Sequence, residues 1–470
     1  MEEFDFSPDD LEAAGALAVG PDPGYTYPDD PLVAENLKRW QDHKFGVIIH
    51  WGIYSSIGQA GSWSLHREHL GSFTDKPAEF SGTDAEYHSW YLDRFRDFEG
   101  KNFEASEWAK ICARAGMRYM VFTTKHHDGY CLYDSAYTNF KSTSEEAGLK
   151  RDIFAEVTEA FRAEGLETGV YFSKADWSRA EYWDRSLPIS NRFANYSIED
   201  NPRKWQRFVE FTHDQIAELL TNYGQMNVLW LDAGWVRPPE EPIDIDGIAK
   251  IARDLQPGIL VVDREVHGVH ENYRTPEQRV PDSKLDMPWE CCLTLTRSWC
   301  SLKKDDPTKP TSDMIETLLA VVSRGGNLLL GIGPDGEGGL SRHIVDSLNE
   351  IGEWMDVYGH AIYGSRALDD YTEDEFGQVS ATINGEKVPT YSVRTEDGSV
   401  ALFILISDRE TPTQIDITGL PAGYVAQALG GETLSSAGSP AVSLHSDSRF
   451  ACGVSLRKAM EDHSGQWSTT

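Results

Sequence analysis

Two adjacent histidines, His126 and His127, lie in the stretch TTKHHDGY at residues 123–130, directly after an apolar run. Other polar residues follow apolar runs in the same way, among them His50, Asp232 and Arg264. One such residue alone is usually a hydrogen-bonding or helix-capping group. Polar residues that recur after several apolar runs indicate a functional site. If these runs are the strands of a barrel, their carboxyl ends meet at one rim. The histidine pair is compatible with metal ligands, an acid/base pair or a sugar-binding edge.

The spacing of the two histidines disfavours a metal site. Alternate residues of a strand face the same side, so a metal pair usually reads His-x-His, and adjacent histidines face one side only at an irregular strand end. A nucleotide site is disfavoured because the glycines of SRGGN (323–327) precede an apolar run instead of opening a helix. Carboxylates, histidines and tryptophans remain, with no cofactor or metal predicted. Two carboxylates around a sugar are the usual arrangement for glycoside hydrolysis.

The apolar runs that carry these residues read as strands of a parallel sheet, because they are continuous rather than alternating in polarity. They are FGVII (45–49), YMVFTT (119–124), GVYFS (169–173), NVLWL (227–231), ILVV (259–262), CCLTL (291–295) and NLLLGI (327–332). Helical patterns lie between them, at 104–116, 151–165, 201–224 and 312–326. This alternation predicts an α/β fold, a (β/α)8-like TIM barrel over residues 31–362.

The pattern changes after residue 365. Short alternating runs with Asn-Gly and Asp-Gly turns, such as VSATING and TYSVRTEDGSVALFILIS, predict a small C-terminal antiparallel β-sandwich over residues 365–460. Residues 1–30 are acidic and rich in Pro, Gly and Asp, which indicates an N-terminal extension, and residues 461–470 read as a tail.

The charge balance narrows the range of partners. The chain has 76 acidic and 43 basic residues, a formal net charge of −33. A chain this negative repels polyanions, so we expect neither nucleic acid nor an anionic membrane surface as a partner. No signal peptide and no run long enough to cross a bilayer are visible, and six scattered cysteines favour reduced thiols and a cytoplasmic location. A homo-oligomer is left open.

Several long motifs resemble the family-29 α-L-fucosidases, which are retaining exo-glycosidases. They include KFGVIIHWGIYS (44–55), EWAKICARAGMRYMVFTTKHHDGYCLYDS (107–135), QIAELLTNYGQMNVLWLDAGW (215–235), PWECCLTL (288–295) and GGNLLLGIGPDGEG (325–338). The resemblance covers most of residues 31–365 and implies a barrel followed by a β-sandwich. It implies as substrate a fucosylated oligosaccharide or glycoside, with no cofactor.

The resemblance also implies roles for individual residues. Asp232 matches the family's nucleophile, and Arg264 matches an arginine beside it that contacts the sugar. His50, His126 and His127 are expected to hydrogen-bond fucose hydroxyls. The aromatic positions of the pocket fall on Trp63, Tyr171, Trp230 and Trp299.

Two glutamates compete for the role of general acid/base. Glu277, in TPEQ, lies in a segment of 263–288 that reads as a mobile loop because it contains Pro276, Pro281 and Pro288. Glu290, in PWECC, precedes an apolar run and reads as a strand-start residue held by structural hydrogen bonds. We therefore expect Glu277 to be the acid/base and keep Glu290 as the alternative.

Two positions depart from the family pattern. Ser62 precedes Trp63 where many members have glutamate, which would weaken or displace a contact to fucose. Cys300 stands in SWCS where the family has SWGY, which affects the loop that carries Trp299. Two other functions stay open: a catalytically silent fucose-binding barrel, and a metal-dependent barrel hydrolase that uses His50, His126 and Asp232.

Overall fold

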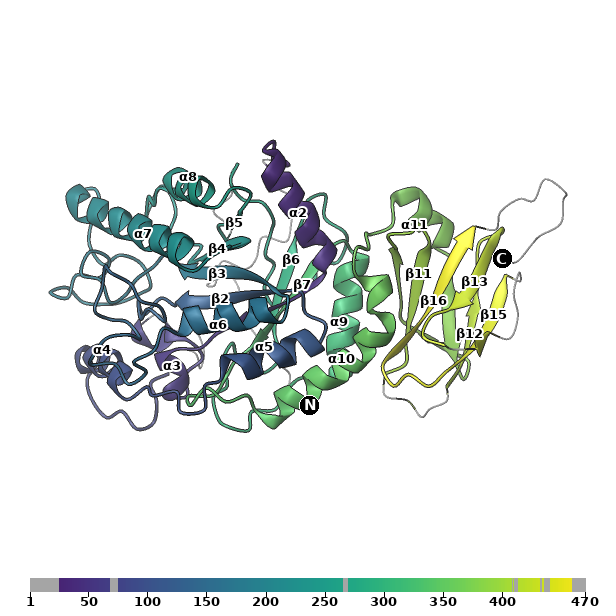
Figure 1. The fold of residues 1–470 in the computed structure, drawn as a ribbon, viewed down its shortest axis with the longest axis horizontal. Helices are drawn as coiled ribbons and strands as arrows, with labels where there is room; N and C mark the ends of the chain where they lie inside the picture. Colours follow the sequence, from purple (N-terminus) through teal and green to yellow (C-terminus); the bar gives the residue numbers. More distant parts are fainter. Residues whose placement is uncertain are drawn as a thin grey trace.

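The computed structural model describes residues 25–67, 75–264, 269–407, 409, 413–431, 433–434 and 440–458. It has a barrel part that ends with helix α10 and a smaller part beside it that consists of β-strands and the short helix α11 (Asp370–Phe376), with helices α9 and α10 between the two (Figure 1). Most of the predicted N-terminal extension and the whole predicted tail lie outside the described residues.

The barrel part is built on a parallel sheet of seven strands in the order β5-β4-β3-β2-β1-β7-β6. The strands are β1 (Phe45–Ile49), β2 (Tyr119–Lys125), β3 (Glu167–Ser173), β4 (Val228–Asp232), β5 (Leu260–Val262), β6 (Glu290–Thr294) and β7 (Asn327–Ile332). Each corresponds to one of the predicted apolar runs, and nearly every residue in them is buried. The prediction of a TIM-barrel fold with a C-terminal β-sandwich is confirmed.

An irregular extended segment, residues 272–278, fills the gap between β5 and β6. Its Asn272 amide donates to the Val261 carbonyl of β5 over 2.9 Å, and the Glu290 amide of β6 donates to the Arg274 carbonyl over 2.7 Å. Parallel bridges join Arg274 to Trp289 and Glu277 to Cys292. The segment belongs to no helix or strand, as expected for a loop, but these bonds hold it in the barrel wall.

Helices cover the outside of the sheet. The long ones are α5 (Ala105–Arg114), α6 (Ile153–Ala163), α7 (Pro202–Asn222), α8 (Ile245–Leu255), α9 (Thr311–Ser323) and α10 (Arg342–Ile362). Four of them match the predicted helical patterns to within three residues at each end. Pro202 begins α7, where its missing N–H costs nothing, but Asn201 makes no side-chain cap there.

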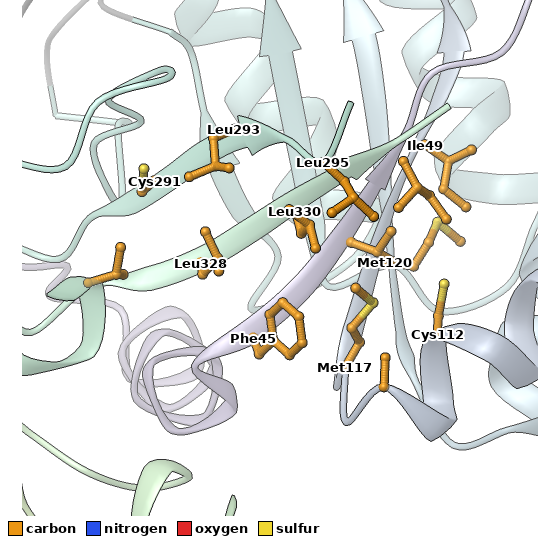
Figure 2. Close-up of a cluster of buried hydrophobic side chains, with 14 of the residues drawn as sticks. Phe45, Ile49, Cys112, Met117, Met120, Cys291, Leu293, Leu295, Leu328 and Leu330 are labelled. Carbon is orange, nitrogen blue, oxygen red and sulfur yellow. The ribbon is translucent and has the colours of Figure 1, made fainter. Parts of the chain in front are cut away.

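Alternate residues of each strand belong to two different cores. Outward-facing side chains such as Phe45, Met120 and Leu328 pack toward the helices (Figure 2). Inward-facing ones such as Ile48, Val121 and Leu329 fill the barrel lumen. Helix α2 (Pro31–His43) places Val33, Leu37 and Trp40 in the lumen cluster, beside the first residues of the strands. The site at the other end of the lumen therefore rests on a packed core.

The C-terminal part contains two antiparallel sheets with strand orders β10-β11-β16-β13 and β14-β15-β12-β8-β9. Their strands are β8 (Ser380–Ile383), β9 (Glu386–Val388), β10 (Thr390–Arg394), β11 (Val400–Leu405), β12 (Thr413–Thr418), β13 (Tyr424–Ala428), β14 (Thr433–Leu434), β15 (Ala441–Ser446) and β16 (Ala451–Lys458). Burial alternates along β12 and β15, as expected for strands with one face in a core. Trp354 of α10 donates to the Ala451 carbonyl over 2.8 Å, which joins the two parts.

Among the described residues, none of the helices combines the length and the apolar character that a bilayer crossing requires.

The burial of Lys44 makes the stability of the fold depend on pH in a way that can be measured. Its side chain is 0% exposed, and its Nζ has no hydrogen-bond partner among the described residues. Burial, with the nearby Arg366 charge, lowers the pKa of Lys44 to about 7. The unfolded chain thus binds more protons than the folded chain between pH 7 and the ordinary lysine pKa, so this group destabilises the fold most at low pH.

We predict that Lys44→Met raises the free energy of unfolding below pH 7, by up to about 4 kcal/mol, and that the gain shrinks as pH rises toward 10. Urea unfolding of both proteins across this pH range measures the difference. Lys38→Met, on the exposed side of α2, is the control and should show no such pH dependence. A gain for Lys44→Met that is equal at all pH values would contradict the prediction.

Candidate active site

The predicted site residues, except Glu290, converge at the carboxyl ends of the barrel strands. Each of them contacts at least one other member of the group through a hydrogen bond, an ion pair or a ring contact. They are His50, Trp63, His126, His127, Tyr171, Trp230, Asp232, Arg264, Glu277 and Trp299.

Arg264 lies between the two carboxylates. Its Nε is 3.3 Å from Asp232 Oδ1, and its Nη2 donates a short hydrogen bond to Glu277 Oε2. The Arg264 side chain is 3% exposed, so both ion pairs are shielded from water. The second oxygen of Glu277 accepts from Trp299 Nε1 over 3.2 Å. Asp232 and Glu277 therefore face the same guanidinium from two sides.

The backbone around Arg264 is tightly constrained. Arg264 has a positive φ of 51°, which is unfavourable for a residue with a side chain. A side chain on Gly234, two residues after Asp232, would place its Cβ 2.5 Å from the Arg264 carbonyl oxygen. Only glycine permits this approach, which brings the end of β4 against the end of β5.

Asp232 is held in the ionised form. Burial alone would raise its pKa, but the charge of Arg264 and a hydrogen bond donated by the Tyr171 hydroxyl hold the pKa of Asp232 well below its usual range. Tyr171 was predicted only as an aromatic of the pocket. Its position two residues before the end of β3 aims it into the lumen, and the sequence carries no further sign that it donates to Asp232.

The two adjacent histidines both face the site because β2 ends irregularly. The register between β2 and β3 shifts between Thr123 and Lys125, immediately before His126. The ring centroids of His126 and His127 lie 4.0 Å apart. His126 Nδ1 is 2.6 Å from Ser62 Oγ, and His127 Nδ1 is 2.7 Å from Ser173 Oγ. The two serines fix the ring orientations, and neither was predicted to do so.

The histidines are neutral at ordinary pH. Burial lowers the pKa of His50 to about 3 and that of His126 to about 4, and it lowers the pKa of His127 well below the usual value. His50 Nδ1 and His127 Nε2 are buried and have no hydrogen-bond partner among the described residues. Such nitrogens can donate to or accept from hydroxyl groups of a ligand.

Aromatic rings enclose this polar group. Trp299 lies 4.9 Å from His50, and Trp63 lies 4.9 Å from His127, measured between ring centroids. Trp177 and Trp235 also pack against His127, at 5.1 and 5.0 Å. The last two were not predicted as site residues, although Trp235 lies only three positions after Asp232 in the sequence.

The two departures from the family pattern are both buried. Ser62 contacts His126, as described above. Cys300 lies with its Sγ 2.9 Å from the Gln59 carbonyl oxygen, which joins the loop of Trp299 to the loop before Ser62. Glu290, in contrast, lies at the opposite end of the lumen, where its oxygens accept from Tyr119 and Trp230.

One group of residues in the site has the composition of a metal centre. Candidate ligand atoms of His126, His127 and Asp232 lie within 4.8 Å of one another. Both Nδ1 atoms, however, face serine hydroxyls, and the carboxylate is paired with Arg264. A cation bound there would be repelled by the guanidinium, so the geometry favours a polar, uncharged ligand.

A barrel with two carboxylates, neutral histidines and aromatic rings at the carboxyl ends of its strands has the characteristics of a glycoside hydrolase. Comparisons with known proteins agree. The family model described as alpha-L-fucosidase matches residues 16–360. The chain belongs to the α-L-fucosidase family and is a glycoside hydrolase.

Individual relatives show how far the similarity extends. The chain is 30% identical to the plasma alpha-L-fucosidase of Rattus norvegicus over 376 residues, which are 76% of this chain and 77% of the relative. It is 28% identical to the human tissue alpha-L-fucosidase over 369 residues, 76% of each chain. Among solved structures, it is similar to alpha-L-fucosidase isoenzyme 1 from Paenibacillus thiaminolyticus, with a TM-score of 0.71, 28% identity and coverage of 91% and 99%.

Ser62 provides a test of the histidine geometry. We predict that Ser62→Ala lowers kcat/KM for 4-nitrophenyl α-L-fucoside by about tenfold, because His126 loses a buried hydrogen bond worth about 1 kcal/mol or more. Steady-state kinetics measures the effect. Ser64→Ala is the matched control, since Ser64 lies in the same short helix (Ser62–Leu65) but bonds to Tyr87. Equal losses in both variants would contradict a specific role for Ser62.

Proposed function

We propose that this protein releases terminal α-L-fucose from glycosides by a double displacement with retention of configuration. In this proposal Asp232 is the nucleophile and Glu277 is the general acid/base. The observation that carries it is Arg264, which pairs with both carboxylates in a site that also offers neutral histidines to a sugar. Retaining glycosidases use two carboxyl groups about 5–5.5 Å apart, a separation compatible with two carboxylates that share one guanidinium.

Asp232 has the properties that a nucleophile requires. It is ionised, because its pKa is held low, and it extends from the end of a rigid strand. Tyr171 and Arg264 fix one oxygen each, which orients the carboxylate toward a sugar bound among the histidines. The similar α-fucosidase of Thermotoga maritima has been solved with a mechanism-based inhibitor, with 25% identity and a TM-score of 0.68.

Glu277 is proposed to protonate the leaving oxygen in the first step. Arg264 and the Trp299 indole N–H then stabilise the carboxylate that Glu277 becomes. In the second step this carboxylate removes a proton from the water that attacks the fucosyl-enzyme, and Arg264 again neutralises the charge of the departing Asp232. The bridge between Glu277 and Cys292 keeps the acid/base on the barrel wall throughout.

The rest of the site is proposed to recognise the sugar. His50 and His127 offer buried nitrogens to the hydroxyl groups of fucose. Aromatic faces such as Trp63 and Trp299 suit the C–H faces of the ring and the C6 methyl group. A galactose would place a hydroxyl against such an apolar wall, where it finds no partner.

The two carboxylates can be told apart with azide. We predict that Asp232→Ala loses at least about 10³-fold in kcat, and that azide then yields β-fucosyl azide by direct inversion. Glu277→Ala should still form the fucosyl-enzyme from 4-nitrophenyl α-L-fucoside, whose leaving group needs little protonation. Azide should then attack that enzyme and yield α-fucosyl azide. NMR identifies the anomer in each case.

Two results would contradict these assignments. An unchanged kcat in Asp232→Ala would contradict the assignment of Asp232 as the nucleophile. If Glu277→Ala shows only a higher KM and gives no fucosyl azide, the assignment of Glu277 as the acid/base is contradicted. Assay of the wild-type protein after treatment with a strong chelator tests the metal-dependent alternative, for which activity should be lost. A complete lack of turnover in the wild-type protein would favour a fucose-binding barrel.

The proposed role of Asp232 also predicts a pH effect. Tyr171→Phe removes a hydrogen bond that stabilises the ionised carboxylate, so the pKa of Asp232 should rise and the acid limb of kcat/KM should move to higher pH. Rates measured between pH 3 and 8 test this. Tyr133→Phe removes another buried hydroxyl, one that makes no contact with Asp232, and should leave the limb in place. An acid limb that moves to lower pH in Tyr171→Phe would contradict the assignment.

A further inference from the structure

Glu290 is a fully buried carboxyl group inside the barrel lumen, away from the two carboxylates of the site. It is 0% exposed and lies at the first residue of β6. Its Oε2 accepts from the Tyr119 hydroxyl over 2.5 Å, and its Oε1 accepts from Trp230 Nε1 over 3.1 Å. The lumen around it is lined by aromatic and aliphatic side chains, including the stacked rings of Trp40 and Tyr273.

Trp230 connects Glu290 to the site. Its ring stacks on Tyr171, with centroids 5.5 Å apart and planes 18° from parallel. The guanidinium of Arg264 lies over the ring of Trp230, 4.9 Å from its centroid. Tyr171 and Arg264 are the two residues that hold the oxygens of Asp232. The same indole therefore supports both partners of the proposed nucleophile.

We propose that Glu290 is a positioning residue for the reaction, which fixes Trp230 and through it holds Tyr171 and Arg264 against Asp232. This inference rests on the proposed role of Asp232. Glu290 itself touches neither the sugar nor the reacting atoms, so it has no part in proton transfer.

The chemistry of the lumen supports this role. A carboxyl group in an apolar interior is costly, and apolar side chains of similar size often serve stability as well or better. Burial raises the pKa of Glu290 to about 7, which reflects that cost. What the carboxyl group adds is an acceptor for the indole N–H. That bond fixes the rotation of the Trp230 ring in its own plane, which packing alone constrains less.

Two substitutions at Glu290 test the inference. Glu290→Met removes both acceptors at similar volume, and we expect kcat to fall about 10- to 100-fold, as for a small misplacement of catalytic groups. Glu290→Gln keeps one acceptor oxygen for Trp230 and should recover much of the loss. The loss should be equal for 4-nitrophenyl and phenyl α-L-fucosides, and azide should give no fucosyl azide. Loss of an acid/base would instead be larger for the poorer leaving group.

Tyr119→Phe is the matched control. It removes a different donor to Glu290 and leaves the bond to Trp230 in place, so kcat should stay within about twofold of the wild-type value. Near-UV circular dichroism should change in Glu290→Met, through the tryptophan bands, more than in Tyr119→Phe. Melting temperatures establish that each variant is folded.

The outcomes separate this inference from the proposed function. A folded Glu290→Met with wild-type kcat overturns the inference and leaves the role of Asp232 intact. An Asp232→Ala variant that keeps turnover overturns the proposed function instead. An azide product from Glu290→Met would make Glu290 the acid/base and overturn both assignments. If Glu290→Met does not fold, Trp230→Phe is the variant to measure, because it retains an aromatic ring but has no N–H to donate to Glu290. An unchanged kcat in Trp230→Phe overturns the inference.

Discussion

The buried guanidinium of Arg264 is the charge on which the rest of the site depends. A cation that is 3% exposed is stable only where negative groups surround it, and here Asp232 and Glu277 do so. The fold must therefore bring three separate chain segments together: the end of β4, the residues after β5 and the segment 272–278. The positive φ of Arg264 and the contact that requires Gly234 show how closely the first two segments approach.

The barrel lumen is graded in polarity from one end to the other. Helix α2 closes the end near the first residues of the strands with apolar side chains, and Glu290 lies above it as a single carboxyl group among aromatic rings. Trp230 and Tyr171 form the next layer, and the ion pairs and histidines form the last one. This low-dielectric surrounding strengthens the ion pairs and also keeps the histidines neutral. Burial therefore keeps the imidazoles uncharged, whereas Asp232 is ionised because the Arg264 charge outweighs the effect of burial on its carboxyl group.

The sequence was sufficient to predict the barrel strands, because each is an uninterrupted apolar run buried on both faces. It was also sufficient to state the condition for the histidine pair, an irregular strand end, which the register shift after Thr123 fulfils. It was less informative for residues 272–278. The prolines of the segment 263–288 indicated a loop, and residues 272–278 form no helix or strand. Asn272, Arg274 and Glu277 are nevertheless bonded to β5 or to the start of β6 through isolated contacts that have no periodic sequence pattern.

The hydrogen-bond partners of the candidate site residues could not be predicted from the sequence, for a different reason. Ser62 and Ser173 are short polar residues with no distinctive spacing, and only the folded chain brings them within 2.7 Å of the histidines. The family resemblance implied that Tyr171 is an aromatic residue of the pocket, whereas its contact with Asp232 depends on the adjacent positions of β3 and β4 in the sheet. These hydrogen-bond partners are determined by contacts between strands that are far apart in the sequence.

The order of strands explains how the two carboxylates come to face one guanidinium. Asp232 ends β4, Arg264 follows the neighbouring strand β5, and Glu277 lies in the segment beyond β5. Neighbouring strands are about 4.8 Å apart, so the backbones of Asp232 and Glu277 are roughly 10 Å apart. Both side chains contact the guanidinium between them, so the carboxyl groups lie closer together than the backbones. Because both backbones are bonded into the barrel wall, the separation of the two carboxyl groups is set by the spacing of the strands.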